Sequence, residues 1–126
     1  MSFIVSRKRF EELTEEALAA LPDEFRQYLT NVTVIVEDYP GREDAHLTGV
    51  PRDELLGLFR GIAHQDKGGM FDIPPPLPDE VILFQKNIQE ICSSEEELID
   101  EIRITLIHEI GHYFGFSEEE LEQYEG

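Results

Sequence analysis

Residues 94–115 constrain the fold of this chain more than any other segment. Ser94 followed by Glu97 is a capping box that starts a helix, and Gly115 can end one in the left-handed conformation. Between them, apolar residues recur every three or four positions and cover much of the helix circumference: Leu98, Ile99, Ile102, Leu106, Ile110, Tyr113 and Phe114. The pattern predicts a largely buried helix over Glu95–Phe114.

The same helix carries the sequence His-Glu-Ile-Gly-His at residues 108–112. Two histidines four residues apart project from one helix face, where they can bind one Zn²⁺ at about 2.0–2.1 Å per nitrogen. Glu109 lies beside the first histidine and can act as general base toward a zinc-activated water. The alternative interpretation is that His108 and His112 are ordinary helix histidines and Glu109 a surface acid.

A catalytic zinc site usually needs a third protein ligand. Gly115 allows the chain to turn sharply, and Glu118 follows six residues after His112, the spacing H-E-x-x-H-x-x-G-x-x-ligand. We therefore rank Glu118 first and Glu119 second as the third ligand. Glu120 has its own explanation, because with Ser117 it forms a capping box that begins a last short helix. Two histidines and a carboxylate also suit Fe(II), so zinc is the preferred metal and iron the alternative.

With 126 residues, the chain is expected to form one domain over residues 1–126. Apolar residues between Phe10 and Leu21 indicate an amphipathic helix, and Pro22 introduces a second, short one. Strands are expected at residues 31–37, 55–60 and 81–88, the last buried on both faces near its start. Residues 55–60 fit either a strand or a helix. The glycine- and proline-rich residues 61–79 are expected to form either a lid over the site or a long connection.

The formal net charge of −18 argues against two classes of partner. Nucleic acid and anionic membranes both require Lys and Arg, so neither is expected to bind. The acidic surface is either a solubilising layer or a field that attracts metal cations and basic substrates. No segment is apolar enough to span a membrane or to act as a signal peptide. The single cysteine, Cys92, is expected to be a small buried residue. These features predict a cytoplasmic protein, and His46 and His64 are expected to be exposed in loops.

Residues 108–121 resemble the signature of small bacterial zincin-like metallopeptidases, the minimal zincins. Weaker similarity extends to the N-terminal helix, the strand at 31–37 and the segments 56–61 and 81–84. The resemblance implies an α+β fold, in which a small mixed β-sheet packs against an active-site helix and N-terminal helices. It also implies Zn²⁺ held by His108, His112 and Glu118, with Glu109 as the catalytic acid/base of a hydrolase acting on peptide bonds.

The sequence departs from related metallopeptidases in three respects. Position 118 is Glu, whereas the small family usually has Asp. Metzincins carry a third histidine and a methionine turn after the motif, but the methionines here, Met1 and Met70, both precede it. We also expect no second lobe, which leaves an open site suited to peptides or flexible protein segments. Two other functions remain open: a non-catalytic zinc-binding protein, and an acidic binding module without metal.

Overall fold

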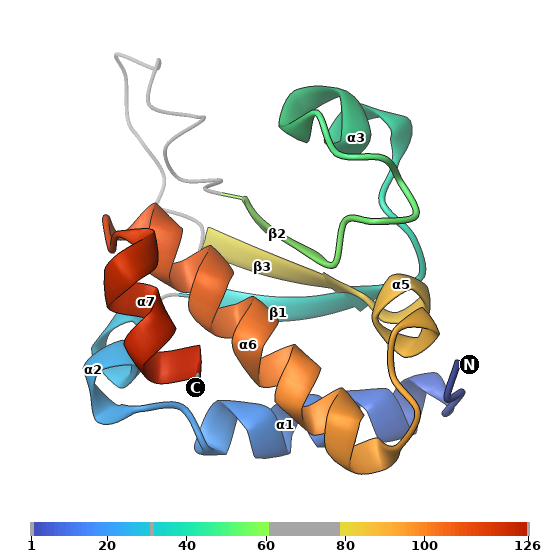
Figure 1. The fold of residues 1–126 in the computed structure, drawn as a ribbon, viewed down its shortest axis with the longest axis horizontal. Coiled ribbons are helices and arrows are strands. Elements are labelled where there is room, and N and C mark those ends of the chain that lie inside the picture. The colour runs from blue at the N-terminus through green and yellow to red at the C-terminus, as the bar shows by residue number, and fades with distance from the viewer. Residues whose placement is uncertain (1, 31, 61–78, 126) are drawn as a thin grey trace, which may run out of the picture.

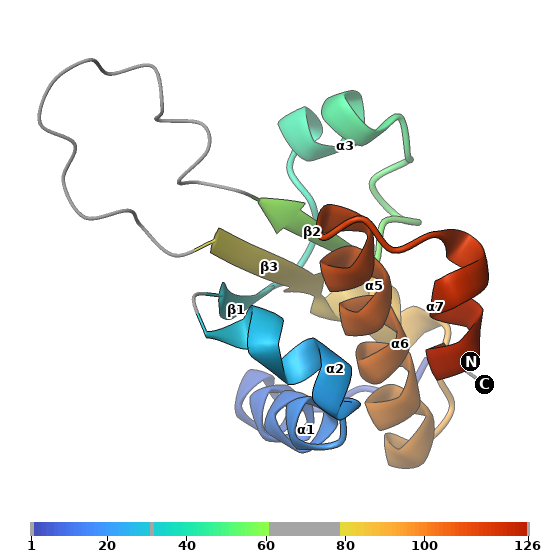
Figure 2. The same ribbon diagram turned by 90° about the vertical axis from the view of Figure 1, so that its left-hand side faces the viewer.

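The structure is a computed structural model that describes residues 2–30, 32–60 and 79–125. It has the expected α+β fold, in which helices cover one face of a small mixed sheet (Figures 1 and 2). Within the described residues, no helix has the length and apolar content needed to cross a lipid bilayer. The predictions for His64 and for a lid or connection at residues 61–79 fall almost entirely outside the described part of the chain.

The sheet has three strands in the order β1-β3-β2. Strand β1 (Val32–Glu37) runs parallel to the central strand β3 (Asp79–Phe84), and β2 (Gly57–Arg60) pairs with β3 antiparallel. Side chains of β3 alternate between two apolar clusters, so the strand is buried on both faces as expected. Strand β2 lies at the edge of the sheet, which leaves its outer backbone groups available to the motif helix.

Three predicted strand boundaries were wrong. Strand β2 begins at Gly57 instead of residue 55, and β3 begins at Asp79 instead of residue 81. Strand β3 also ends at Phe84, after which α5 (Gln85–Glu90) is helical. The buried polar side chains of α5 explain this change. Asn87 donates hydrogen bonds to the carbonyl oxygens of Arg52 and Leu55, at 2.6 and 2.8 Å. In the helix, the Asn87 amide faces the loop before β2 and satisfies both of these carbonyl groups.

The helical layer consists mainly of α1 (Arg7–Ala19) and α6 (Glu95–Tyr113), which lie side by side across the sheet (Figure 1). The short helices α2 (Asp23–Arg26) and η1 (Gln27–Leu29) follow α1. The core contains many of the apolar positions predicted from the sequence, but Ile99 and Tyr113 are only partly buried and Phe114 is exposed. The confirmed core positions, each at most 3% exposed, are Phe10, Leu13, Ala17, Leu21, Phe25, Leu98, Ile102, Leu106 and Ile110. The helix predicted over Glu95–Phe114 is thus confirmed to within one residue.

Two further helices flank this core. Helix α3 (Arg42–Thr48) was not predicted. It begins where the Gly41 N–H donates to Asp44 Oδ2 at 3.0 Å, and it ends at Gly49, which has a φ of +72°. His46 is exposed as expected, but it lies in this helix and not in a loop. Helix α7 (Glu118–Glu125) is the predicted last helix and packs beside α6 (Figure 2). Cys92 is 2% exposed, so its predicted burial is confirmed.

Candidate metal centre

The two motif histidines lie one turn apart on the exposed side of α6. Their ring centroids are 5.3 Å apart. Neighbouring residues of the same helix, Leu106, Ile107 and Ile110, are fully buried and fix the rotation of α6 against the core. The core therefore determines which helix face His108 and His112 present to solvent.

A tight turn after α6 brings the chain back toward the histidines. Gly115 has a φ of +89°, a left-handed conformation that favours glycine. The Phe116 N–H donates to the Gly111 carbonyl at 2.8 Å, and the Gly115 N–H donates to the His112 carbonyl at 3.1 Å. These bonds satisfy carbonyl groups at the end of α6 that have no partner within the helix. The turn directs α7 back along α6.

The predicted capping box fixes where α7 begins. The Glu120 N–H donates to Ser117 Oγ at 3.1 Å, and the Ser117 N–H donates to Glu120 Oε1 at 2.8 Å. Glu120 is thereby engaged with the backbone, as expected. Glu118 occupies the first turn of α7, where the helix dipole also favours a negative charge.

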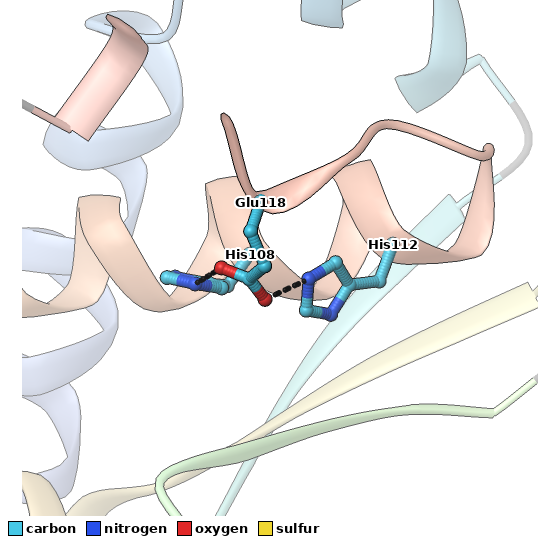
Figure 3. Close-up of side chains that lie close together, drawn as sticks. All are labelled: His108, His112 and Glu118. Atoms are coloured by element: carbon cyan, nitrogen blue, oxygen red, sulfur yellow. Dashed lines mark hydrogen bonds and ion pairs between the residues drawn. The ribbon is translucent and has the colours of Figure 1, made fainter. Parts of the chain in front are cut away.

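Glu118 is the acid that the turn brings to the histidines. Its Oε1 lies 2.6 Å from His112 Nε2, and its Oε2 lies 3.3 Å from His108 Nε2 (Figure 3). The contact with His108, reinforced by the contact with His112, lowers the pKa of the Glu118 carboxyl. Glu119 is exposed and is not part of this group. The structure therefore places Glu118, the acid ranked first, beside both histidines and leaves Glu119, the acid ranked second, outside the group.

The chemistry and spacing of these three side chains fit a zinc ion. Their candidate ligand atoms all lie within 4.8 Å of one another. In a tetrahedral site with bonds of about 2.1 Å, ligand atoms lie about 3.4 Å apart, so small side-chain shifts suffice. Two imidazoles and one carboxylate form a donor set found in catalytic zinc enzymes. The side chains of His108, His112 and Glu118 are 32%, 46% and 66% exposed, which leaves room for water at a further coordination position.

Glu109 lies on a different side of α6, facing the edge strand. Its Oε1 accepts a hydrogen bond of 3.1 Å from the Phe59 backbone N–H of β2. Burial raises the pKa of the Glu109 carboxyl, and the Phe59 N–H opposes part of this rise. A raised pKa brings a carboxylate closer to the range in which a general base works efficiently at neutral pH.

Gly57 allows the edge strand to approach α6 closely enough for this contact. A Cβ at Gly57 would lie 2.6 Å from Thr105 Cγ2 and 3.1 Å from the Ile82 carbonyl oxygen. The Phe59 ring stacks on Tyr113 of α6 with centroids 3.8 Å apart, which holds the other end of the strand. Phe59 was not predicted as a site residue, because its role comes from a backbone N–H that every non-proline residue has.

A depression of about 270 Å³ lies between the segment that leads into β2 and helix α6. Its lining includes the motif histidine His108 and the candidate base Glu109. The other lining residues are Leu55, Leu56, Gly57, Glu101, Ile104 and Thr105. The depression is thus placed where a small segment of another molecule can contact both His108 and Glu109.

Comparisons with known proteins identify the family and the fold. Residues 29–126 match the sequence profile of the family described as zincin-like metallopeptidase. No curated protein matches this chain. Among solved structures, a chain described as a "conserved hypothetical protein" from Thermo thermophilus is similar in fold, with 23% identity and a TM-score of 0.50 over 86% of this chain and 94% of that chain. The profile match covers most of the sequence, and the chain therefore belongs to the zincin-like metallopeptidase family.

Proposed function

We propose that this protein is a zinc-dependent peptidase. The observation that carries the proposal is that His108 and His112 of α6 and Glu118 of α7 lie close together. Glu109 of α6 lies nearby and is hydrogen-bonded to the edge strand β2. Family membership supports the same reaction class. Zn²⁺ is the metal that best suits the donor set, and Fe(II) is the alternative.

Bound zinc supplies a Lewis acid that polarises the scissile carbonyl and makes water a stronger nucleophile near neutral pH. Glu109 takes a proton from the attacking water as the new C–O bond forms. It then passes that proton to the amide nitrogen as the C–N bond breaks. The hydrogen bond from the Phe59 N–H positions the Glu109 carboxylate at the depression, where it can perform both proton transfers.

We infer that the substrate is a peptide or a flexible protein segment. The depression beside His108 and Glu109 is small, about 270 Å³, and the motif histidines are partly exposed. A short extended segment can reach such a site without enclosure by the protein. The high acidic content opposes nucleic acid and anionic membranes as partners, and we propose a cytoplasmic location.

The test combines metal analysis with a peptide digest. Protein purified without added metal should contain about one equivalent of zinc, measured by mass spectrometry that also reports iron. A broad peptide library should be cleaved by the wild-type protein and not by Glu109→Gln, which should keep its zinc. Hydrolysis by the Glu109→Gln variant at the wild-type rate would overturn the mechanism.

A non-catalytic zinc protein is the second candidate. The observation that favours it is that Glu118 belongs to α7 while the two histidines belong to α6, so one ion would cross-link two helices. One equivalent of zinc with no cleavage of any library peptide would support this candidate. Absence of any bound metal would instead favour an acidic binding module.

A further inference from the structure

We propose that Glu125 is the positioning residue for His108, holding its imidazole so that Nε2 faces the metal. Glu125 Oε1 lies 2.6 Å from His108 Nδ1, while His108 Nε2 lies 3.3 Å from Glu118. The two nitrogens of one ring therefore contact two carboxylates of the same helix. The inference rests on the proposed metal site, because it assigns one nitrogen to the ion and the other to Glu125.

The sequence of α7 explains how one helix reaches both sides of the ring. Glu118, Leu121 and Glu125 are separated by three and four residues, so they share one face of α7. Leu121, in the middle, is fully buried against α6. With this residue fixed, Glu118 and Glu125 lie one on each side of it and both reach His108.

The position of Glu125 is electrostatically unfavourable in two respects. It is the last residue of α7, where the helix dipole disfavours a negative charge. Its side chain is only 17% exposed. Burial raises the pKa of the nearby Glu101 carboxyl, and the charges of Asp100 and, to a smaller extent, Glu125 act in the same direction. The short contact with His108 Nδ1 is the favourable interaction that offsets these costs.

Arg103 holds the end of α7 in place without competing for the Glu125 carboxylate. Its Nη1 donates to the Tyr124 carbonyl oxygen at 2.9 Å, and its Nη2 lies 3.5 Å from the Glu125 carbonyl oxygen. These are backbone groups that α7 leaves without partners at its end. The backbone of Glu125 is thus anchored by Arg103, and its side chain is left to contact His108.

The chemical consequence is a fixed tautomer. A carboxylate at 2.6 Å favours the proton on His108 Nδ1, so the lone pair is on Nε2, the nitrogen that faces Glu118. Histidines that bind metals commonly donate their other N–H to a carboxylate, and loss of such a partner typically weakens metal binding about 10- to 100-fold. Glu125 is therefore expected to act on zinc affinity through His108 without touching the ion.

The experiment compares three variants of the full chain. Glu125→Ala removes the contact, Glu125→Gln keeps an acceptor oxygen, and Glu122→Ala removes an exposed glutamate of the same helix that has no hydrogen bond or ion pair in the described part of the chain. Zinc affinity is measured by competition with a chromogenic chelator. Circular dichroism of each metal-free variant establishes that it is folded.

Glu125→Ala should bind zinc about 10- to 100-fold more weakly than the wild type, whereas Glu122→Ala should stay within about twofold and Glu125→Gln should recover most of the loss. Equal affinities for Glu125→Ala and Glu122→Ala would overturn the inference, as would a Glu125→Gln variant no better than Glu125→Ala.

A second measurement separates this inference from the proposed function. In metal-free protein with neutral imidazoles, ¹⁵N NMR should find the His108 proton on Nδ1 in the wild type and spread over both nitrogens in Glu125→Ala. An unchanged tautomer distribution would overturn the positioning role. A wild-type protein that binds no zinc but shows the tautomer shift would overturn the proposed function and leave the His108–Glu125 contact established.

Discussion

Leu121 of α7 occupies the space where a Cβ of residue 111 would lie, and Gly111 makes this possible because it has no side chain. The glycine inside the H-E-x-x-H motif therefore has a packing role. It lets α7 approach α6 closely enough for Glu118 to contact both motif histidines. The position of the third candidate ligand depends on this one close approach between the two helices.

Gly111→Ala should disrupt this approach. Alanine in place of glycine normally stabilises a helix by about 1 kcal/mol. Here its methyl group would clash with the fully buried Leu121, and overpacking of this kind typically costs about 1–3 kcal/mol. We expect a net loss of stability in urea unfolding and weaker zinc binding, because Glu118 moves with α7. A variant both more stable and equal in zinc affinity would contradict the role of this contact.

Glu118→Ala should weaken zinc binding strongly, and Glu119→Ala should not. Glu118 lies 2.6 Å from His112 Nε2, whereas Glu119 is exposed and outside the candidate ligand group. Both variants remove one negative charge from the first turn of α7, so any effect through the helix dipole is matched. Isothermal titration with zinc distinguishes them, and equal losses in the two variants would refute Glu118 as a ligand.

Removal of metal should destabilise the protein and loosen α7 first. An ion held by His108, His112 and Glu118 would link α6 to α7. Free zinc at about 100 times its Kd would add about 2.7 kcal/mol to the free energy of unfolding. We expect the Tm to fall on addition of EDTA and to recover with zinc. After metal removal, the rate of hydrogen exchange should increase most at the backbone amides of residues 118–125. A Tm that is independent of EDTA would contradict a bound ion.

Cys92 should make the folded state less stable at high pH. Burial raises the pKa of its thiol to about 11, and the negative charges of Glu101 and Glu97 add to the rise. A thiol in the unfolded chain has a pKa of about 8.5. Below that pH the thiol is protonated in both the folded and the unfolded state, and its full contribution to the free energy of unfolding is present. As the pH rises toward 11, only the unfolded chain ionises, so stability is lost.

The measurement is urea unfolding at about pH 8 and about pH 10.5. The decrease in the free energy of unfolding should be larger for the wild type than for Cys92→Ala by about 2 kcal/mol. The alanine variant controls for tyrosines and lysines that titrate in the same range. Parallel losses in the two proteins would show that the thiol ionises equally easily in both states.

Local sequence patterns predicted the parts of the site that lie within one or two turns of chain. The four-residue spacing placed His108 and His112 on one face of α6, and that face is the exposed one. The capping box that begins at Ser117 is present with both expected hydrogen bonds. At Ser94 the Glu97 N–H donates to Ser94 Oγ as expected, but the Glu97 carboxylate accepts from the Ser93 N–H and not from that of Ser94. These predictions succeed because a cap or a helix face depends on residues three or four positions apart.

The predictions that failed concerned segments whose conformation depends on distant partners. Residues 85–88 have a strand-like composition, yet they are helical because Gln85 and Asn87 satisfy backbone carbonyls of Val5, Arg52 and Leu55. Those carbonyls are dozens of residues away in the sequence, so no local rule identifies them. Helix α3 is a different case, because Asp44 and Gly49 supply ordinary end signals that could have predicted it.

The sequence by itself therefore determined the face of α6 that carries the candidate ligands His108 and His112, the turn at Gly115 and the start of α7. Only the tertiary structure decided that β2 would be the edge strand whose Phe59 N–H holds Glu109, and that Glu125 would reach the second nitrogen of His108. The physical reason is that both contacts join separate elements. Their geometry follows from how close the elements pack, which Gly57 and Gly111 permit and the buried core enforces.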